Sequence, residues 1–135
     1  MNYWLLKTEP DTFSWDDLAR DKKTGWDGVR NFQARSHLKA MSKGDLAFVY
    51  HTGEEKSVVG IAKITKESYP DPKDNEWVAV EIAPVSKLKN AVGLAQIKGD
   101  KRFKNMVLVR ASRLSVQPVT KEEFDMIVAL SEEKS

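Results

Sequence analysis

Apolar residues occur in short uninterrupted runs along this chain, and polar turn residues separate the runs. Residues 3–7 (YWLLK) have the composition of a buried strand, which ends at the turn-forming sequence TEPD. Two further runs, 46–51 (LAFVYH) and 57–66 (SVVGIAKITK), flank the polar sequence TGEEK and together predict a β-hairpin. Gly60 interrupts the second run and indicates a bulge or a close backbone approach.

Two segments begin with residues that cap helices. Ser14, followed three residues later by Asp17, predicts a short helix over 15–20. Thr120 and Glu123 form the same capping pattern for a final helix. The inward face of that final helix is expected to carry Phe124, Ile127 and Leu130.

The spacing of apolar residues predicts another helix in the first third of the chain. Ala34, Leu38 and Met41 recur at i, i+4 and i+7, which places them on one inward face. Asn31 is suited to cap the N-terminus of this helix, and Gly44 is suited to end it.

Proline and turn residues dominate the stretch 69–76 (YPDPKDNE), which predicts an exposed loop before a strand over 77–83. Residues 94–98 predict a helical turn. The sequences VLVR at 107–110 and SRLSVQPV at 112–119 predict one or two further strands. About five strands with short helices between them favour an α+β fold around a small barrel-like sheet.

The composition is that of one soluble domain spanning residues 1–135, with 41% hydrophobic and 31% charged residues. The formal net charge of +2 excludes a polycation that binds nucleic acid by bulk charge alone. The chain has no cysteine, which excludes disulfides, thiolate zinc sites and a cysteine nucleophile. We expect a cytoplasmic protein and favour a monomer.

Neither a metal nor a membrane is an expected partner. His37 and His51 are the only histidines, and they do not form an HExxH pair or a similar metal-binding spacing. The apolar stretch 3–6 is too short for a signal peptide or a membrane span. We therefore expect no metal, no other cofactor and no membrane attachment.

The densest group of potential ligand-binding side chains lies in the segment 26–35 (WDGVRNFQAR), between a glycine-flanked loop and a helix N-terminus. The free N–H groups of a first helical turn can hold a phosphate or the acceptor edge of a base. A tryptophan face can stack on a nucleobase. The candidate binding residues in this segment are Trp26, Val29, Arg30, Asn31 and Arg35.

The same segment also allows an interpretation in which it has a purely structural role. In it, Trp26 fills the core, Asn31 only caps the helix, and Arg30 and Arg35 are solvated surface charges. A segment needed only for packing seldom combines two arginines, an asparagine and a glutamine with two glycines and an aromatic residue. We therefore favour binding over a purely structural role.

Candidate residues outside this segment lie at strand ends. Tyr50 and His51 are neighbours on one strand, so that only one of them is expected to face a pocket. Lys7 is expected to flank the pocket, and Ser115 lies in a polar row that alternates with apolar residues and is expected at its rim.

Six ordered blocks of sequence resemble the EVE-domain family, part of the PUA-like superfamily that is related to YTH domains. The blocks are YWLLKTEP at 3–10, WDGVRNFQAR at 26–35, GDLAFVYH at 44–51, VVGIAKI at 58–64, YPDP at 69–72 and RLSVQP at 113–118. The resemblance implies a PUA-like five-stranded β-barrel with flanking short helices. It also implies a pocket for a modified nucleobase in DNA or RNA.

The resemblance makes Trp26 the best candidate for a pocket wall, by analogy with the aromatic cage of YTH domains. It places Asn31, Tyr50 and His51 beside the same pocket, and Lys7, Arg30 and Arg35 where they can contact phosphate. On this hypothesis, replacing Trp26 with Ala is expected to abolish binding to a modified oligonucleotide and to leave the melting temperature near that of the wild type.

Two other functions are compatible with the sequence. One is a small amidohydrolase that acts on a modified nucleoside, like some PUA-like relatives of the ASCH type, with Lys7, Thr8 and Glu9 as the reactive group. An extended backbone directs Lys7 and Glu9 to one face and Thr8 to the other, which argues against this trio. The other is a protein-interaction module. We expect a binding domain rather than an enzyme.

Overall fold

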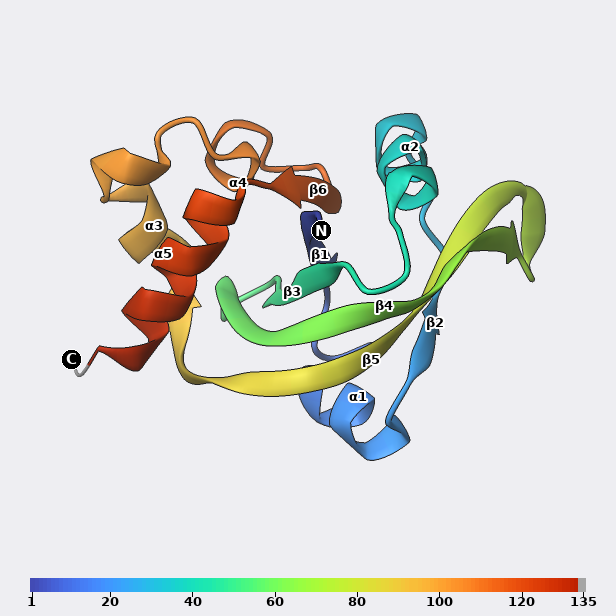
Figure 1. Ribbon diagram of the computed structural model, residues 1–135, viewed down its shortest axis with the longest axis horizontal. Helices are drawn as coiled ribbons and strands as arrows, with labels where there is room; N and C mark the ends of the chain where they lie inside the picture. The colour runs from blue at the N-terminus through green and yellow to red at the C-terminus, as the bar shows by residue number, and fades with distance from the viewer. Residues whose placement is uncertain (134–135) are drawn as a thin grey trace.

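The computed structural model describes residues 1–133 as an α+β fold in which helices flank one six-stranded mixed sheet (Figure 1). The strand order is β2-β5-β4-β3-β1-β6, and only the central β1–β3 pair is parallel. The strands are β1 (Tyr3–Thr8), β2 (Thr24–Trp26), β3 (Leu46–His51), β4 (Ser57–Asp71), β5 (Asp74–Gly93) and β6 (Val116–Val119). The α-helices are α1 (Trp15–Asp21), α2 (Phe32–Ala40), α3 (Leu94–Lys98), α4 (Val107–Arg110) and α5 (Lys121–Glu132), and a 3-10 turn covers Lys101–Phe103.

Both faces of the central strands are buried, which explains their uninterrupted apolar sequences. On β1, Trp4 and Leu6 join one core cluster and Leu5 joins the other. Helices α1 and α2 cover the first cluster, while α3, α4 and α5 cover the second. Figure 1 shows α3, α4 and α5 gathered at one end of the long strands.

The predicted helix caps are confirmed. Ser14 and Asp17 form a reciprocal capping box on α1, and Thr120 and Glu123 form another on α5. The side chain of Asn31 accepts a hydrogen bond from a backbone N–H in the first turn of α2. The predicted helical turn over 94–98 is α3, which is also confirmed.

Three predictions about strands are wrong in part. The sheet has six strands instead of five because residues 24–26 form the short strand β2, and within residues 1–133 its edges β2 and β6 do not pair to close a barrel. Of the one or two strands predicted over 107–110 and 112–119, the second sequence contains β6, whereas residues 107–110 form α4. Most of the stretch 69–76 is exposed, as predicted, but only residues 72–73 form a turn, and the others continue the β4–β5 hairpin, in which Pro70 pairs with Val78.

Gly60 is required by close packing of α1 against β4. The register of β4 against β5 shifts between Val58 and Gly60, which confirms the predicted bulge. A Cβ atom at Gly60 would lie 2.5 Å from the indole ring of Trp15, which confirms the close approach. Trp15 is itself a core residue, so the ring has little freedom to move away.

Replacing Gly60 with Ala is expected to destabilise the fold by about 1–3 kcal/mol, because the added methyl group overpacks the core against Trp15. Urea denaturation measures this change. The matched control is Gly93→Ala, since a Cβ atom there would lie 3.8 Å from the Ser57 hydroxyl and the backbone φ is −75°. The control should stay within about 0.5 kcal/mol of the wild type. An equally stable Gly60→Ala variant would contradict the packing argument.

Candidate functional site

Two cavities lie side by side at the carboxyl end of β1. The tryptophan cavity, about 510 Å³ in volume, is lined by Phe13, Trp26, Val29 and Arg30 together with polar residues. The lysine cavity, also about 510 Å³, is lined by Tyr50 and by the cations Lys7, Lys56, Lys98 and Arg113. Both volumes lie in the range of about 300–1,000 Å³ that is usual for ligand pockets. The residues common to both linings are Lys7, Thr8, Glu9 and Ser115.

Strand pairing brings together three of the predicted site residues. Lys7 is the register partner of Tyr50 in the parallel ladder, and its backbone N–H donates to the Ser115 carbonyl at 2.9 Å. The Lys7 ammonium donates to the carbonyl of Ser112 at 2.6 Å and lies 5.6 Å from the centre of the Tyr50 ring. Desolvation by burial lowers the pKa of Lys7 and raises the pKa of Tyr50. The phenol therefore stays protonated as a hydrogen-bond donor near neutral pH.

Trp26 belongs both to the core and to the cavity wall. It ends β2, opposite Val80 of β5, and only 9% of its surface is exposed. Phe13 packs edge-on against it, with ring centres 6.2 Å apart. The burial of Trp26 changes the expected effect of Trp26→Ala, because loss of a large buried aromatic residue costs about 3–5 kcal/mol of folding stability. The melting temperature is therefore expected to fall.

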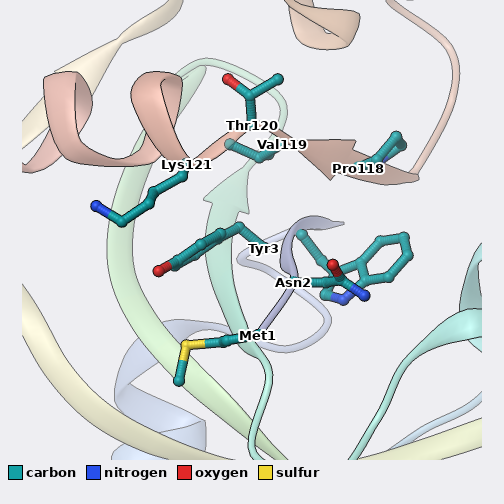
Figure 2. Close-up of a pocket in the computed structure, with 8 residues that line it drawn as sticks. Met1, Asn2, Tyr3, Pro118, Val119, Thr120 and Lys121 are labelled. Carbon is teal, nitrogen blue, oxygen red and sulfur yellow. The ribbon is translucent and has the colours of Figure 1, made fainter.

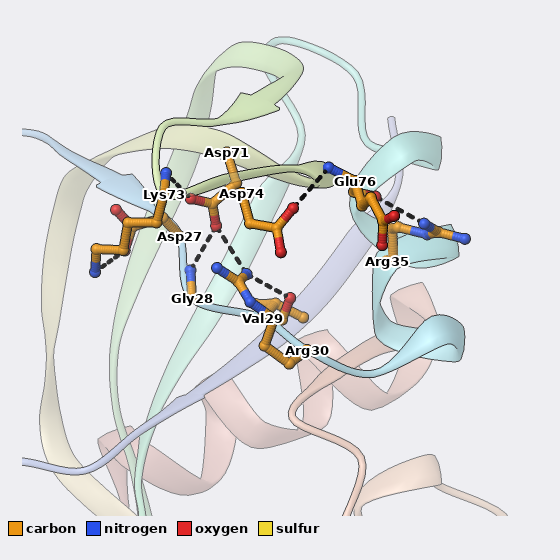
Figure 3. A network of polar contacts seen from close by, with 9 residues as sticks. All are labelled: Asp27, Gly28, Val29, Arg30, Arg35, Asp71, Lys73, Asp74 and Glu76. Atoms are coloured by element: carbon orange, nitrogen blue, oxygen red, sulfur yellow. Dashed lines mark hydrogen bonds and ion pairs between the residues drawn. The ribbon is translucent and has the colours of Figure 1, made fainter.

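A buried carboxylate, Asp71, fixes the loop between Trp26 and α2 (Figure 3). It accepts hydrogen bonds from the backbone N–H of Gly28 at 2.9 Å, from the Arg30 guanidinium at 3.0 Å and from the backbone N–H of Lys73 at 2.8 Å. The hairpin end of β4 thus holds the loop that carries Val29 and Arg30 into the tryptophan cavity. The sequence reasoning missed Asp71 because it assigned YPDPKDNE to an exposed loop.

The hydrogen bonds around Asp71 outweigh the effect of its burial. Burial alone would raise the pKa of this carboxyl group, whereas the N–H groups of Gly28 and Lys73 and the Arg30 guanidinium lower it to about 2. Asp71 is therefore ionised at all physiological pH values. Its charge also compensates that of Arg30, whose side chain remains 37% exposed beside the cavity.

Three predicted site residues lie outside both cavities. His51 is buried, and its Nε2 accepts the backbone N–H of Trp15 at 3.0 Å while Nδ1 contacts the Glu55 carboxylate at 3.0 Å. Asn31 caps α2 and lines a separate, smaller hollow. Arg35 packs against the rings of Phe32 and Trp77 on the outer surface. The distances from its guanidinium carbon to those ring centres are 4.9 and 5.2 Å.

A third cavity, of about 580 Å³, lies at the amino end of β1 and contains none of the nine predicted residues (Figure 2). Its one charged side chain, Lys121, is paired with Asp125 at 2.7 Å. The ring of Tyr3 lies 4.6 Å from that of Phe124, measured between ring centres. Because its charged group already has a partner, this cavity offers less chemistry than the two at the other end of the strand.

No helix among residues 1–133 is long and apolar enough to cross a membrane. Within the same residues, no group of three or more histidine, aspartate or glutamate side chains is arranged to hold a metal ion.

The sequence model of the EVE domain matches residues 2–130 of this chain. The chain belongs to the EVE-domain family. Human thymocyte nuclear protein 1 is 37% identical over 98% of this chain and 75% of the human protein. A Rhodopseudomonas palustris protein of known structure is 44% identical, with a TM-score of 0.93 over 99% of this chain and 97% of that one.

The human relative has also been solved with a ligand. The structure of human THYN1 in complex with DNA that contains 5-methylcytosine superimposes on this EVE domain with a TM-score of 0.94. The two chains are 36% identical, and the match covers 100% of each. The PUA-like EVE fold implied by the sequence is confirmed by these neighbours.

Replacing Asp71 with Asn is expected to destabilise the protein by about 1.5–3 kcal/mol at pH 7, because the hydrogen bonds lose a charged acceptor. The folded-state pKa of about 2 lies below the ordinary 3.8. The stabilisation is therefore full above about pH 4 and is lost as the pH falls through about 2. Thermal unfolding of both proteins across this pH range should show the stability difference shrinking.

Asp74→Asn is the matched control, since Asp74 is exposed and accepts only a backbone hydrogen bond from Glu76. It should change stability by about 0.5 kcal/mol or less. The proposed network would be contradicted if Asp71→Asn were as stable as the wild type at pH 7. It would also be contradicted if the stability difference between the two proteins stayed constant down to pH 2.

Proposed function

We propose that this EVE domain binds DNA that contains a modified cytosine and holds the modified base in the tryptophan cavity. The observation that carries the proposal is a ligand-sized cavity with an aromatic wall, in a chain that matches the DNA-bound human relative over its full length. RNA that carries a modified base is the other partner class compatible with the chemistry of this cavity.

The lining of the tryptophan cavity suits a cytosine. A base that stacks on an aromatic side chain gains about 1–3 kcal/mol, and Trp26 with Phe13 provides that wall. Carboxylates accept hydrogen bonds from the exocyclic amine of cytosine, and Glu9 and Asp27 both line the cavity. Asp27 lies 3.6 Å from the Lys73 ammonium, which makes Glu9 the preferred acceptor.

Recognition of a base in a duplex requires the base to leave the helical stack. That step costs a few kcal/mol, which stacking and edge hydrogen bonds in the cavity offset. A single buried methyl group adds about 0.8 kcal/mol, equivalent to about fourfold in Kd. We therefore propose a moderate preference for the methylated base over the unmodified one.

Replacing Trp26 with Leu is expected to weaken binding to a duplex with one central 5-methylcytosine by about 5- to 150-fold. The change removes the stacking face, worth about 1–3 kcal/mol, while it retains an apolar side chain in the core. Fluorescence anisotropy at a fixed salt concentration measures Kd, and circular dichroism establishes that the variant is folded.

Phe32→Leu is the matched control, because Phe32 is an aromatic residue that is 67% exposed and lines neither cavity. It should bind within about twofold of the wild type. A folded Trp26→Leu variant that binds as tightly as the wild type would remove Trp26 from the base site.

We further propose that the domain binds without turnover. Lys7, Thr8 and Glu9 do line the same two cavities, which is the observation that keeps a hydrolase in consideration. However, the Thr8 hydroxyl donates to the carbonyl of Phe13 at 2.7 Å, and the Lys7 ammonium donates to the carbonyl of Ser112. Neither hydrogen bond activates Thr8 as a nucleophile.

Incubation of the wild-type protein with a panel of acylated nucleosides is expected to yield no deacylated product by chromatography. Thr8→Val serves as the control, since it removes the hydroxyl group and retains the side-chain shape. Product formation by the wild type that disappears in Thr8→Val would establish the amidohydrolase instead.

A further inference from the structure

The lysine cavity gathers positive charge from four separate parts of the chain. Lys7 comes from the end of β1, Lys56 from the turn before β4, Lys98 from the end of α3, and Arg113 from the segment before β6. Within residues 1–133, no carboxylate lies within 4.0 Å of any of these four cations. Glu9 is the one acidic residue in the lining. The cavity therefore has an excess of positive charge.

This lining suits a phosphate. Cations of one sign around a concave surface focus the field and attract an anion. Hydroxyl groups of serine, threonine and tyrosine, together with lysine and arginine, are the side chains that commonly bind phosphate oxygens. The lining contains such hydroxyls at Tyr50, Thr52, Ser112 and Ser115.

The lysine cavity also adjoins the proposed base site. Lys7, Thr8, Glu9 and Ser115 line both cavities, so that only the end of β1 and one residue before β6 separate them. A nucleotide has the same arrangement, since its phosphate is separated from its base by one sugar.

We propose that the lysine cavity binds a backbone phosphodiester next to the modified base, while the tryptophan cavity holds the base itself. This proposal rests on the proposed function, because it places both groups on one strand of the same nucleic acid. Lys7 stands at the junction, where its hydrogen bond to the Ser112 carbonyl and its position over the Tyr50 ring fix the ammonium group. Lys56 and Lys98 line the lysine cavity and not the tryptophan cavity.

The test is the double variant Lys56→Ala/Lys98→Ala, measured by anisotropy against methylated and unmethylated duplexes over a range of salt concentrations. Each lost phosphate contact reduces the slope of log K against log salt by about 0.9. Because the proposal concerns one phosphodiester, we expect the slope to fall by about 0.9 and the affinity at low salt to fall about tenfold. The ratio of Kd values between the two duplexes should stay unchanged, because the base site is intact.

Lys87→Ala/Lys89→Ala is the matched control, since it removes the same charge from two exposed positions that line neither cavity. Its salt slope should remain close to that of the wild type. If the slope of log K against log salt were the same for the two double variants, the proposal would be overturned. The change would then be explained by the loss of net charge and not by a phosphate site in the lysine cavity.

A second arm identifies the phosphate. Duplexes with a neutral methylphosphonate at the linkage on either side of the methylated cytosine should bind the wild type more weakly at one of the two positions. That loss should be smaller in Lys56→Ala/Lys98→Ala, because two of the four cations that line the lysine cavity are already absent. If the losses in affinity caused by the methylphosphonate and by the two lysine substitutions were fully additive, the assignment of this phosphate to the lysine cavity would be overturned. A wild type without preference for the methylated duplex would overturn the proposed function, whereas the salt slope and the methylphosphonate arm test the phosphate site separately.

Discussion

The parallel pairing of β1 with β3 fixes where the candidate functional site of this EVE domain lies. Both faces of these strands are covered by core side chains, and the polar residues Lys7, Thr8, Tyr50 and His51 lie at their carboxyl ends. There Lys7 meets Tyr50 across the ladder, and the Ser115 carbonyl accepts its backbone N–H. The two cavities are the two sides of this strand end, which is why they share one set of lining residues.

In the proposed function, one cavity recognises the base and the other attracts the backbone. One side presents an aromatic wall and carboxylates, which suit stacking and hydrogen bonding to a base edge. The other presents hydroxyls and cations that have no carboxylate within 4.0 Å among residues 1–133, which suits a phosphate. Asp71 supports the first side from a distance, because it ties the loop of Val29 and Arg30 to the β4–β5 hairpin. A chain with a formal net charge of +2 can thus gather an excess of positive charge in the lysine cavity without being a polycation.

Sequence patterns predicted the parts of the structure that local interactions determine. The capping boxes, the buried runs of β1 and β3, and the bulge at Gly60 follow from short-range chemistry and were found. Lys7, Tyr50 and Ser115 were expected beside the pocket of Trp26, but Tyr50 lines the lysine cavity and not the tryptophan cavity. The long hairpin was missed because the two prolines in 69–76 resemble a loop, although Pro70 lies on a strand there. The lysine cavity was also missed, since its cations are far apart in sequence and only the tertiary fold brings them together.

The proposed function depends most on which cavity the modified base enters. The direct measurement is an isotope-filtered NOESY spectrum of the wild-type protein bound to a duplex with one 5-methylcytosine. We predict nuclear Overhauser effects from the 5-methyl protons of the base to ring protons of Trp26 or Phe13, and to the methyl groups of Val29. Methyl contacts with Tyr50 and Leu108 in the lysine cavity, with none to Trp26, would contradict the assignment.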